Sequence, residues 1–249
     1  FEHNGVPHVY NTRAIWALAA MGVAADEPEF IAAARRNLDW ALTQQTASGW
    51  FATNAFVPGR HPFTHTIAYA MRGLLEIGDY AGRDDFLVAA RKIGDAMIAA
   101  LPADGRLPGR FDANWQPTVK WSCLTGDCQL GINWGRLFQI TRDARYRDAT
   151  TRILGFVKKT QLLISDEQPM MGGIKGSHPI NGGYHPWQYP NWATKFYADA
   201  LMMDTRATST CALYGARYPS SRRISRASYA LPRTSFVSSC VIDFTTFSN

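Results

Sequence analysis

Apolar residues recur every three to four positions along most of residues 8–204, which predicts α-helices with essentially no sheet. Some of these segments are rich in small and apolar residues on nearly every side: 11–22, 65–78, 128–141 and a last one at 191–204. The first three are each followed by a segment with an apolar stripe and a charged face: 27–45, 84–101 and 144–161. A helix that is apolar all round is buried, and one with a stripe covers it. We therefore expect inner helices, each covered by an outer helix.

These helical pairs repeat at a nearly constant spacing. Gly22 and Gly78 are 56 residues apart, and so are Gly49 and Gly105. A period of this length with two helices per unit is typical of repeat architectures. Concentric layers of inner and outer helices satisfy both helix types. The sequence thus predicts an all-α fold, an incomplete α/α-toroid of repeated helical hairpins, over residues 1–205.

The pattern stops after residue 205. Residues 206–249 mix serines and arginines with scattered apolar positions and show no period. We expect this tail to be either disordered or the product of a shifted reading frame. Six arginines and one acid lie in it, so most of the net charge of +6 belongs to the tail and residues 1–205 are nearly neutral. The body therefore lacks the basic stripe of a nucleic-acid binder, and we expect no nucleic-acid partner.

The sequence also bears on a membrane and on a carbohydrate as possible partners. No run of about 18 apolar residues is present, so we expect no transmembrane segment. The loops that precede the second, third and fourth inner helices are rich in aromatic residues, interspersed with amides and charges. Flat aromatic faces and hydrogen-bonding groups suit sugar rings, which favours a polysaccharide or oligosaccharide ligand at one end of the barrel. The alternative is that these aromatic side chains plug the mouth as ordinary core.

Candidate catalytic residues lie in the same loops. His65 begins the second inner helix, where the helix N-terminus disfavours imidazolium and would keep the ring a neutral base. Capping or core packing is the competing interpretation of this histidine. Residues that could assist it in proton transfer or charge neutralisation follow the third helical pair: Lys175, His178 and Tyr184.

The remaining candidates would bind the substrate. They are cationic, amide, acidic and aromatic side chains of the mouth: Arg60, His61, Arg110, Trp115, Asp127, Trp187, Asn191 and Trp192. Capping the third inner helix is the other role open to Asp127.

Carboxylates are scarce among the candidates, and the residues of the mouth that could act in pairs are Asp104, Asp112 and Asp127. Glycoside hydrolysis needs two carboxylates that flank the bond. The abundance of histidine, tyrosine and cations instead favours proton abstraction beside a carboxylate, the chemistry of uronate lyases and epimerases.

A zinc site is the other chemistry to weigh. Cys123 and Cys128 could bind zinc together with a loop histidine, but their spacing is wider than that of common zinc ribbons and no second pair completes the set. Two buried thiols explain the pair more simply. We expect no bound metal and no cofactor.

The inner helices begin with three similar segments: HTIAYAMRGLLEIG, CLTGDCQLGINWGRL and YPNWATKFYADAL. With these segments, residues 8–204 resemble the α/α-toroid superfamilies, both the six-hairpin glycosidase and uronate-lyase group and the terpenoid-cyclase and prenyltransferase group. The run from Trp121 to Gly126 is also similar to zinc-bearing lanthionine cyclases, whose Cys-His pair is absent here. The resemblance implies a carbohydrate-active enzyme, with a glycan-binding or biosynthesis-accessory module and a terpenoid-cyclase-like or zinc-dependent enzyme as alternatives.

Overall fold

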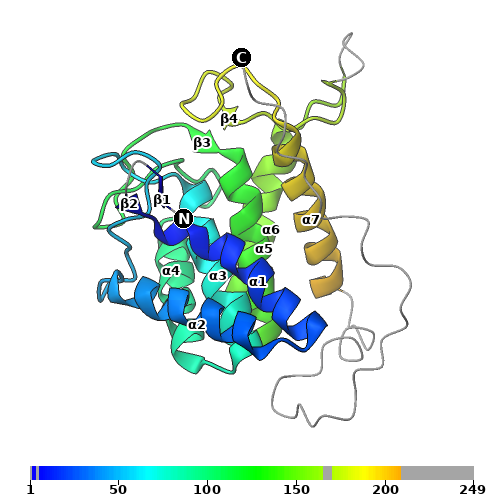
Figure 1. Ribbon diagram of the computed structural model, residues 1–249. Helices are drawn as coiled ribbons and strands as arrows, with labels where there is room; N and C mark the ends of the chain where they lie inside the picture. Colours follow the sequence, from blue (N-terminus) through cyan, green and yellow to red (C-terminus); the bar gives the residue numbers. More distant parts are fainter. Residues whose placement is uncertain (1, 4–5, 165–169, 209–249) are drawn as a thin grey trace.

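The computed structural model describes residues 2–3, 6–164 and 170–208. Within these ranges the chain is mostly helical, and its helices alternate between two layers (Figure 1). The inner layer holds α1 (Thr12–Ala25), α3 (Thr64–Ala81), α5 (Leu124–Thr141) and α7 (Asn191–Thr208). The outer layer holds α2 (Pro28–Thr43), α4 (Asp84–Ala99) and α6 (Ala144–Thr160). The expected incomplete α/α-toroid is confirmed.

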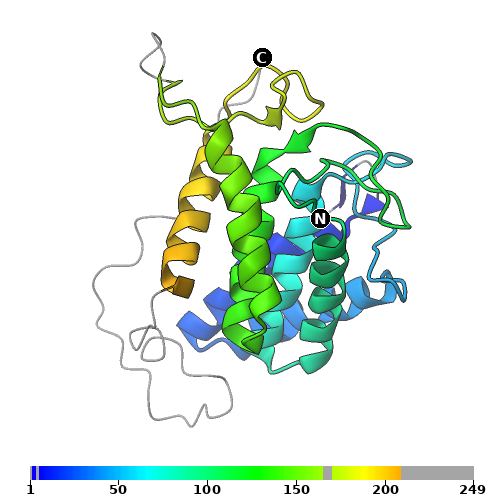
Figure 2. The same cartoon turned by 180° about the vertical axis from the view of Figure 1, so that it is seen from behind.

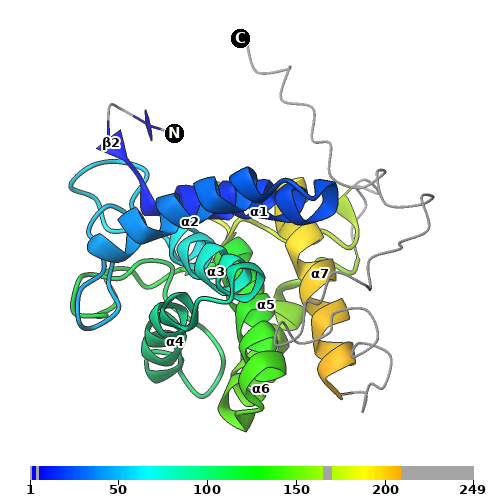
Figure 3. The same ribbon diagram turned by 60° about the horizontal axis from the view of Figure 1, so that its bottom comes forward.

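The inner helices pack in chain order. Helix α3 contacts α1 and α5, and α5 contacts α7, while each outer helix packs against the inner helix that precedes it. Figure 3 shows α3 and α5 between α1 and α7, with α4 and α6 outside them. Figure 2 shows the outer surface of α4 and α6 from behind. The four inner helices therefore form an arc, and its concave side is the interior of the barrel.

Each hairpin turns in the same way. The residue that ends the inner helix has a left-handed conformation in all three: Asp26, Gly82 and Arg142. Such a residue stops a helix and redirects the chain without a long loop. The outer helix then starts within a few residues, at Pro28 in the first hairpin, where proline is well suited to the first helical turn.

The equivalent glycines of the repeat have the same structural role. Gly49 and Gly105 both have a positive φ, which glycine adopts without strain. A side chain on Gly49 would press on Lys92 of α4, and one on Gly105 would overlap the backbone oxygen of Arg152 of α6. The spacing of 56 residues therefore marks the point at which each loop crosses the next outer helix.

The core follows the predicted helix types. Nearly all of α3 is buried, whereas α2 buries one stripe of small and apolar residues: Ala34, Leu38 and Ala41. Trp134 of α5 is fully buried, and its indole nitrogen donates to the backbone oxygen of Gly94 on α4, 3.1 Å away. This contact fixes the inner layer against the outer one.

The strands are very short. β1 (Glu2–His3) pairs with β2 (Val6–Pro7), and β3 (Ser122–Cys123) pairs with β4 (Ser177–His178), both antiparallel. A short 3-10 helix, η1 (Val9–Asn11), precedes α1. No helix of the described ranges is long and apolar enough to cross a membrane. Apart from the end of α7, the tail expected at 206–249 lies outside the described residues.

Candidate functional site

The loops that precede α3, α5 and α7 are joined by backbone hydrogen bonds at one end of the arc. Thr64 donates to the oxygen of Gly109 (3.0 Å), Gly109 to that of Trp121 (2.7 Å) and Leu124 to that of Gly176 (3.1 Å). β3 and β4 lie at this end in Figure 1. The loops thus form the mouth of the barrel, as the repeat predicts.

His65 is the second residue of α3, and only 7% of it is exposed. Its Nδ1 lies 3.0 Å from Oε1 of Gln129 on α5. An amide oxygen can only accept, so Nδ1 donates and Nε2 keeps its lone pair. The rings of Tyr69 and Tyr184 lie 4.3 and 5.4 Å from the imidazole, centroid to centroid. His65 is therefore held between two inner helices and the loop before the fourth.

Burial lowers the pKa of His65 to about 4, and electrostatic interactions with His185 and Arg13 contribute in the same direction. The hydrogen bond with Gln129 opposes the shift but is the smaller effect. The ring is therefore neutral near pH 7, as we expected. The main cause of the lowered pKa is the removal of the imidazole from water, whereas we had expected the helix N-terminus to be responsible.

Gly126 makes this arrangement possible. A side chain there would overlap the hydroxyl of Thr64 and would stand 2.6 Å from the backbone nitrogen of His65. The first turns of α3 and α5 consequently touch at backbone distance. The close approach brings Gln129, one turn further along α5, within reach of the imidazole.

Tyr184 reaches the same place from the loop between β4 and α7. The hydroxyl of Ser177 holds its backbone on both sides, donating to the oxygen (2.7 Å) and accepting from the nitrogen (3.0 Å). The indole nitrogen of Trp192 donates to the phenol oxygen, 3.2 Å away. Burial raises the pKa of Tyr184 and keeps the phenol protonated. His65 and Tyr184 thus pair a neutral base with a neutral acid.

His178 and Lys175 are not in contact with this pair within the described residues. Ser177 and His178 are neighbours in β4, and successive side chains of a strand point to opposite faces. Ser177 faces Tyr184, so His178 faces away and packs edge-on against Phe156 of α6, 5.5 Å between centroids. Burial first, then the charge of Lys175, lowers the pKa of His178.

Arg60, His61 and Arg110 lie together on the rim. The Arg110 guanidinium stacks on the ring of Phe63 at 3.6 Å and donates a hydrogen bond to the backbone oxygen of His61. Phe63 in turn contacts Tyr184, with ring centroids 5.2 Å apart. Arg60 and His61 are exposed. This rim could meet a ligand that enters the mouth.

The remaining aromatic candidates differ in position. Trp192 is 39% exposed and borders the pair through Tyr184. Trp187 is 70% exposed and Asn191, the first residue of α7, is exposed as well. Trp115 packs on Trp50 and donates to the backbone oxygen of Ser48, 3.0 Å away. Trp115 therefore supports the wall of the barrel near the end of α2 and makes no described contact with His65.

Asp127 lies in the first turn of α5, which begins at Leu124, four residues earlier than the sequence pattern predicts. Two positions on a helix are about 200° apart, so Asp127 points away from the face that carries Gln129. It is fully buried, and neither carboxylate oxygen has a hydrogen-bond partner among the described residues. Burial raises the pKa of its carboxyl well above the usual value. This position does not support the expected role in substrate binding.

The two cysteines of the body pack as core residues. Cys123 and Cys128 are buried free thiols. Burial raises the pKa of Cys123 to about 12 and that of Cys128 well above its usual value. Zinc binds thiolates, so these surroundings favour the packing interpretation. No group of three or more potential metal ligands was found in the part of the chain that the structure describes.

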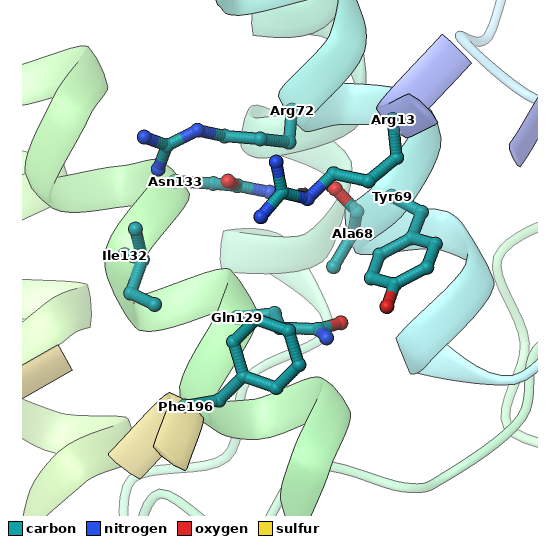
Figure 4. A pocket seen from close by; sticks show the side chains of 8 residues that line it. All are labelled: Arg13, Ala68, Tyr69, Arg72, Gln129, Ile132, Asn133 and Phe196. Carbon is teal, nitrogen blue, oxygen red and sulfur yellow. Dashed lines mark hydrogen bonds between the residues drawn. The ribbon is translucent and has the colours of Figure 1, made fainter. Parts of the chain in front are cut away.

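The structure adds a pocket that we did not anticipate from the sequence. It opens on the concave side of the arc, next to His65, and is lined by side chains of four inner helices: Arg13, Ala68, Tyr69, Arg72, Gln129, Ile132, Asn133 and Phe196 (Figure 4). The signal that could have revealed it is the single arginine on each of two inner helices that consist mainly of apolar and small residues, α1 and α3. A cation among buried positions requires a partner.

The alternating layers, the left-handed hairpin turns and the loops gathered at one end define an α/α-toroid. No sequence profile of a known family matches the chain, and no curated protein matches it significantly. Solved structures share the fold at low identity. An unsaturated glucuronyl hydrolase from Bacillus sp. GL1, described as responsible for the degradation of glycosaminoglycan, matches 83% of this chain and 60% of its own, with a TM-score of 0.65 and 16% identity.

Two further structures extend this likeness. A sugar epimerase from a ruminal bacterium matches 81% of this chain and 55% of its own, with a TM-score of 0.66 and 13% identity. A polysaccharide lyase matches 83% and 62%, with a TM-score of 0.58 and 11% identity. The chain therefore spans between 55% and 62% of the length of these three proteins. At such identity the likeness establishes the fold alone.

Proposed function

We propose that this chain is part of a carbohydrate-active enzyme that acts on an acidic, uronate-containing polysaccharide or oligosaccharide by proton abstraction, as a lyase or an epimerase. The observation that carries the proposal is the pairing of neutral His65 with protonated Tyr184 at the mouth of the barrel. A base and an acid with separated protonation states in one site are the requirement of this chemistry.

In the lyase reaction, His65 Nε2 takes the proton from the carbon that bears the carboxylate. The C–H electron pair forms a double bond to the next carbon, and the glycosidic C–O bond breaks. Tyr184 donates its phenol proton to the leaving oxygen. In the epimerase reaction, a proton returns to the same carbon from the other face. Both begin with the same abstraction, for which His65 is in the required unprotonated form at pH 7.

The acids near the mouth support this chemistry over hydrolysis. Asp104 and Asp112 accept hydrogen bonds from backbone nitrogens of their own turns, at 2.9 Å in each case. Asp127 points away from the face of α5 that carries Gln129, and Glu76 is ion-paired with Arg72 at 2.7 Å. Two free carboxylates that flank a glycosidic bond are therefore not found in the described part of the site.

A carbohydrate substrate is supported by two independent features. Aromatic faces at the mouth, including the exposed Trp187 and the half-exposed Trp192, are suited to stacking against sugar rings. The solved structures with the same fold include a hydrolase that degrades glycosaminoglycan, an epimerase and a lyase. Because this chain spans only part of those proteins, the activity belongs to the proposal and not to the likeness.

The test is turnover of uronate polymers by the purified protein, followed as new ultraviolet absorbance from an unsaturated product. Exchange of the carbon-bound proton with deuterated water detects an epimerase. We expect His65→Gln to reduce either rate by about 10²–10⁴-fold while the helical circular dichroism is retained. Binding of uronate oligosaccharides without turnover or exchange would support a glycan-binding module instead. An active His65→Gln variant would refute the assignment of the base.

A further inference from the structure

Two side chains that line the pocket beside His65 carry buried hydrogen-bond donors without a hydrogen-bond partner among the described residues: Nε2 of Gln129 and Nε of Arg72. The buried acceptor Oε1 of Glu76, which also lacks a hydrogen-bond partner, is ion-paired with the other end of the Arg72 guanidinium. Gln129 is 4% exposed, and its oxygen is already engaged by His65. A buried donor without a partner costs about 1–3 kcal/mol, so this concentration calls for an acceptor-rich ligand.

Positive charge gathers at the same place. The guanidinium carbons of Arg13 and Arg72 lie 4.5 and 4.9 Å from the ring of Trp16, so the two cations stand close together. Figure 4 shows Arg13 reaching over the pocket from α1, and Arg72 from α3. Burial and the like charge of Arg72 lower the pKa of Arg13. The site therefore favours a ligand of negative charge.

The neighbouring carboxylates are shared or engaged elsewhere. Glu76 is ion-paired with Arg72 at 2.7 Å and lies 3.4 Å from Arg136. Arg136 is also bonded to Asp79 at 2.7 Å. On α7, Asp199 is paired with Lys195. Of the three arginines Arg13, Arg72 and Arg136, Arg13 is the one without an ion pair among the described residues, and Glu76 and Asp199 act on it only through longer-range attraction.

The size of the pocket limits what can enter it. Its volume is about 20 Å³, which suits one water molecule or a group of similar size rather than a sugar ring. A carboxylate fits this limit and presents two oxygens with about four lone pairs. Tyr69 and Gln129 line the pocket and also contact His65, so a ring attached to that carboxylate would lie against the imidazole.

We propose that the pocket is a carboxylate-binding subsite, in which Arg13, Arg72 and Gln129 hold the acidic group of the uronate whose proton His65 removes. This inference rests on the proposed function and adds residues that neither the aromatic loops nor the predicted site contain. Charge-assisted hydrogen bonds to the carboxylate would stabilise the extra negative charge that develops when the neighbouring C–H bond breaks. The two arginines predicted at the rim, Arg60 and Arg110, would then contact more distant parts of the chain of sugars.

The test compares glucuronate oligosaccharides with carboxyl-reduced oligosaccharides of the same length, by calorimetric binding to the full chain. We expect the wild type to prefer the acidic form and Arg13→Gln to weaken its binding by about 10- to 100-fold, with the reduced form little affected. Arg36→Gln, an exposed arginine of α2, is the matched control and should bind both as the wild type does. Arg13→Lys keeps the charge and should retain part of the preference.

The outcomes separate the two proposals. If Arg13→Gln loses the same affinity for the acidic and the reduced oligosaccharides, or loses none, the carboxylate subsite is refuted while the proposed function stands. If the wild type binds neither form, the proposed function itself fails. Thermal unfolding of each variant shows whether a loss of binding reflects an unfolded protein. If Arg13→Gln does not fold, the comparison of Arg13→Lys with wild type tests the subsite instead. A preference for the acidic form that a folded Arg13→Lys variant retains at least in part, and that Arg13→Gln loses, supports the subsite.

Discussion

Nδ1 of His65 and Oε1 of Gln129 lie 3.0 Å apart although 64 positions separate the two residues in the chain. The contact joins the first turn of one inner helix to the first turns of the next, and it fixes the tautomer of the imidazole. It also links the proposed base to the pocket, because Gln129 lines that pocket with its amide nitrogen. The catalytic and binding proposals therefore meet at one hydrogen bond.

The depressed pKa of His65 predicts a pH-dependent stability. The folded value, about 4, lies below the ordinary 6.5, so the unfolded chain binds the proton more readily between these values. Stability is complete above pH 6.5 and falls as the pH drops toward 4. We expect the free energy of unfolding to fall by about 2 kcal/mol more between pH 7 and 4.5 in wild type than in His65→Gln. Urea unfolding at both pH values measures this, and equal slopes in the two proteins would contradict it.

Tyr184 provides a test of proton donation. Tyr184→Phe removes the phenol proton, and we expect turnover to fall by about 10²-fold or more. The indole nitrogen of Trp192 also loses its acceptor, which should cost about 1 kcal/mol of stability. Tyr189→Phe, in the same loop, is the control. Full activity in the Tyr184 variant would leave its role as packing against His65.

Gly126 provides a test of the close approach between α3 and α5. We expect Gly126→Ala to destabilise the fold by about 1–3 kcal/mol, because a methyl group there overlaps Thr64 and the backbone of His65. Gly155→Ala is the control: that position of α6 has open space around it, and alanine should stabilise the helix by about 0.5–1 kcal/mol. Thermal melts of the two variants should shift in opposite directions.

The buried carboxyl of Asp127 predicts a pH dependence of opposite sign. Its folded pKa is raised, so the contribution of this group to stability is lost as the pH rises through the folded value. Asp127→Asn stays neutral at every pH. Relative to wild type, we expect the variant to gain stability as the pH rises above the ordinary range of a carboxyl group. Denaturation curves that change in parallel over this rise in pH would show that the carboxyl is not shielded from water.

The hydrophobic pattern alone determined the architecture. Periodicity separates helices that are apolar all round from helices with one stripe, and burial leaves these two types little choice but inner and outer layers. Gly49 and Gly105 illustrate the agreement, since their equal spacing in the sequence corresponds to equivalent crossings of α4 and α6. Loop composition also indicated the mouth, because connections between antiparallel helices collect at the two ends of the barrel. The catalytic roles of His65 and Tyr184 stay predictions.

Only the tertiary structure decided which face each side chain occupies. Asp127 and Gln129 are two positions apart, yet one is buried away from the concave surface and the other bonds to His65. His178 is next to Ser177 but faces away from Tyr184. Arg13 is distant in sequence from the loops of the mouth, and it reaches the pocket because α1 packs beside α3. A periodic pattern specifies which positions are buried, whereas the partner of a buried polar group depends on how the helices pack against one another.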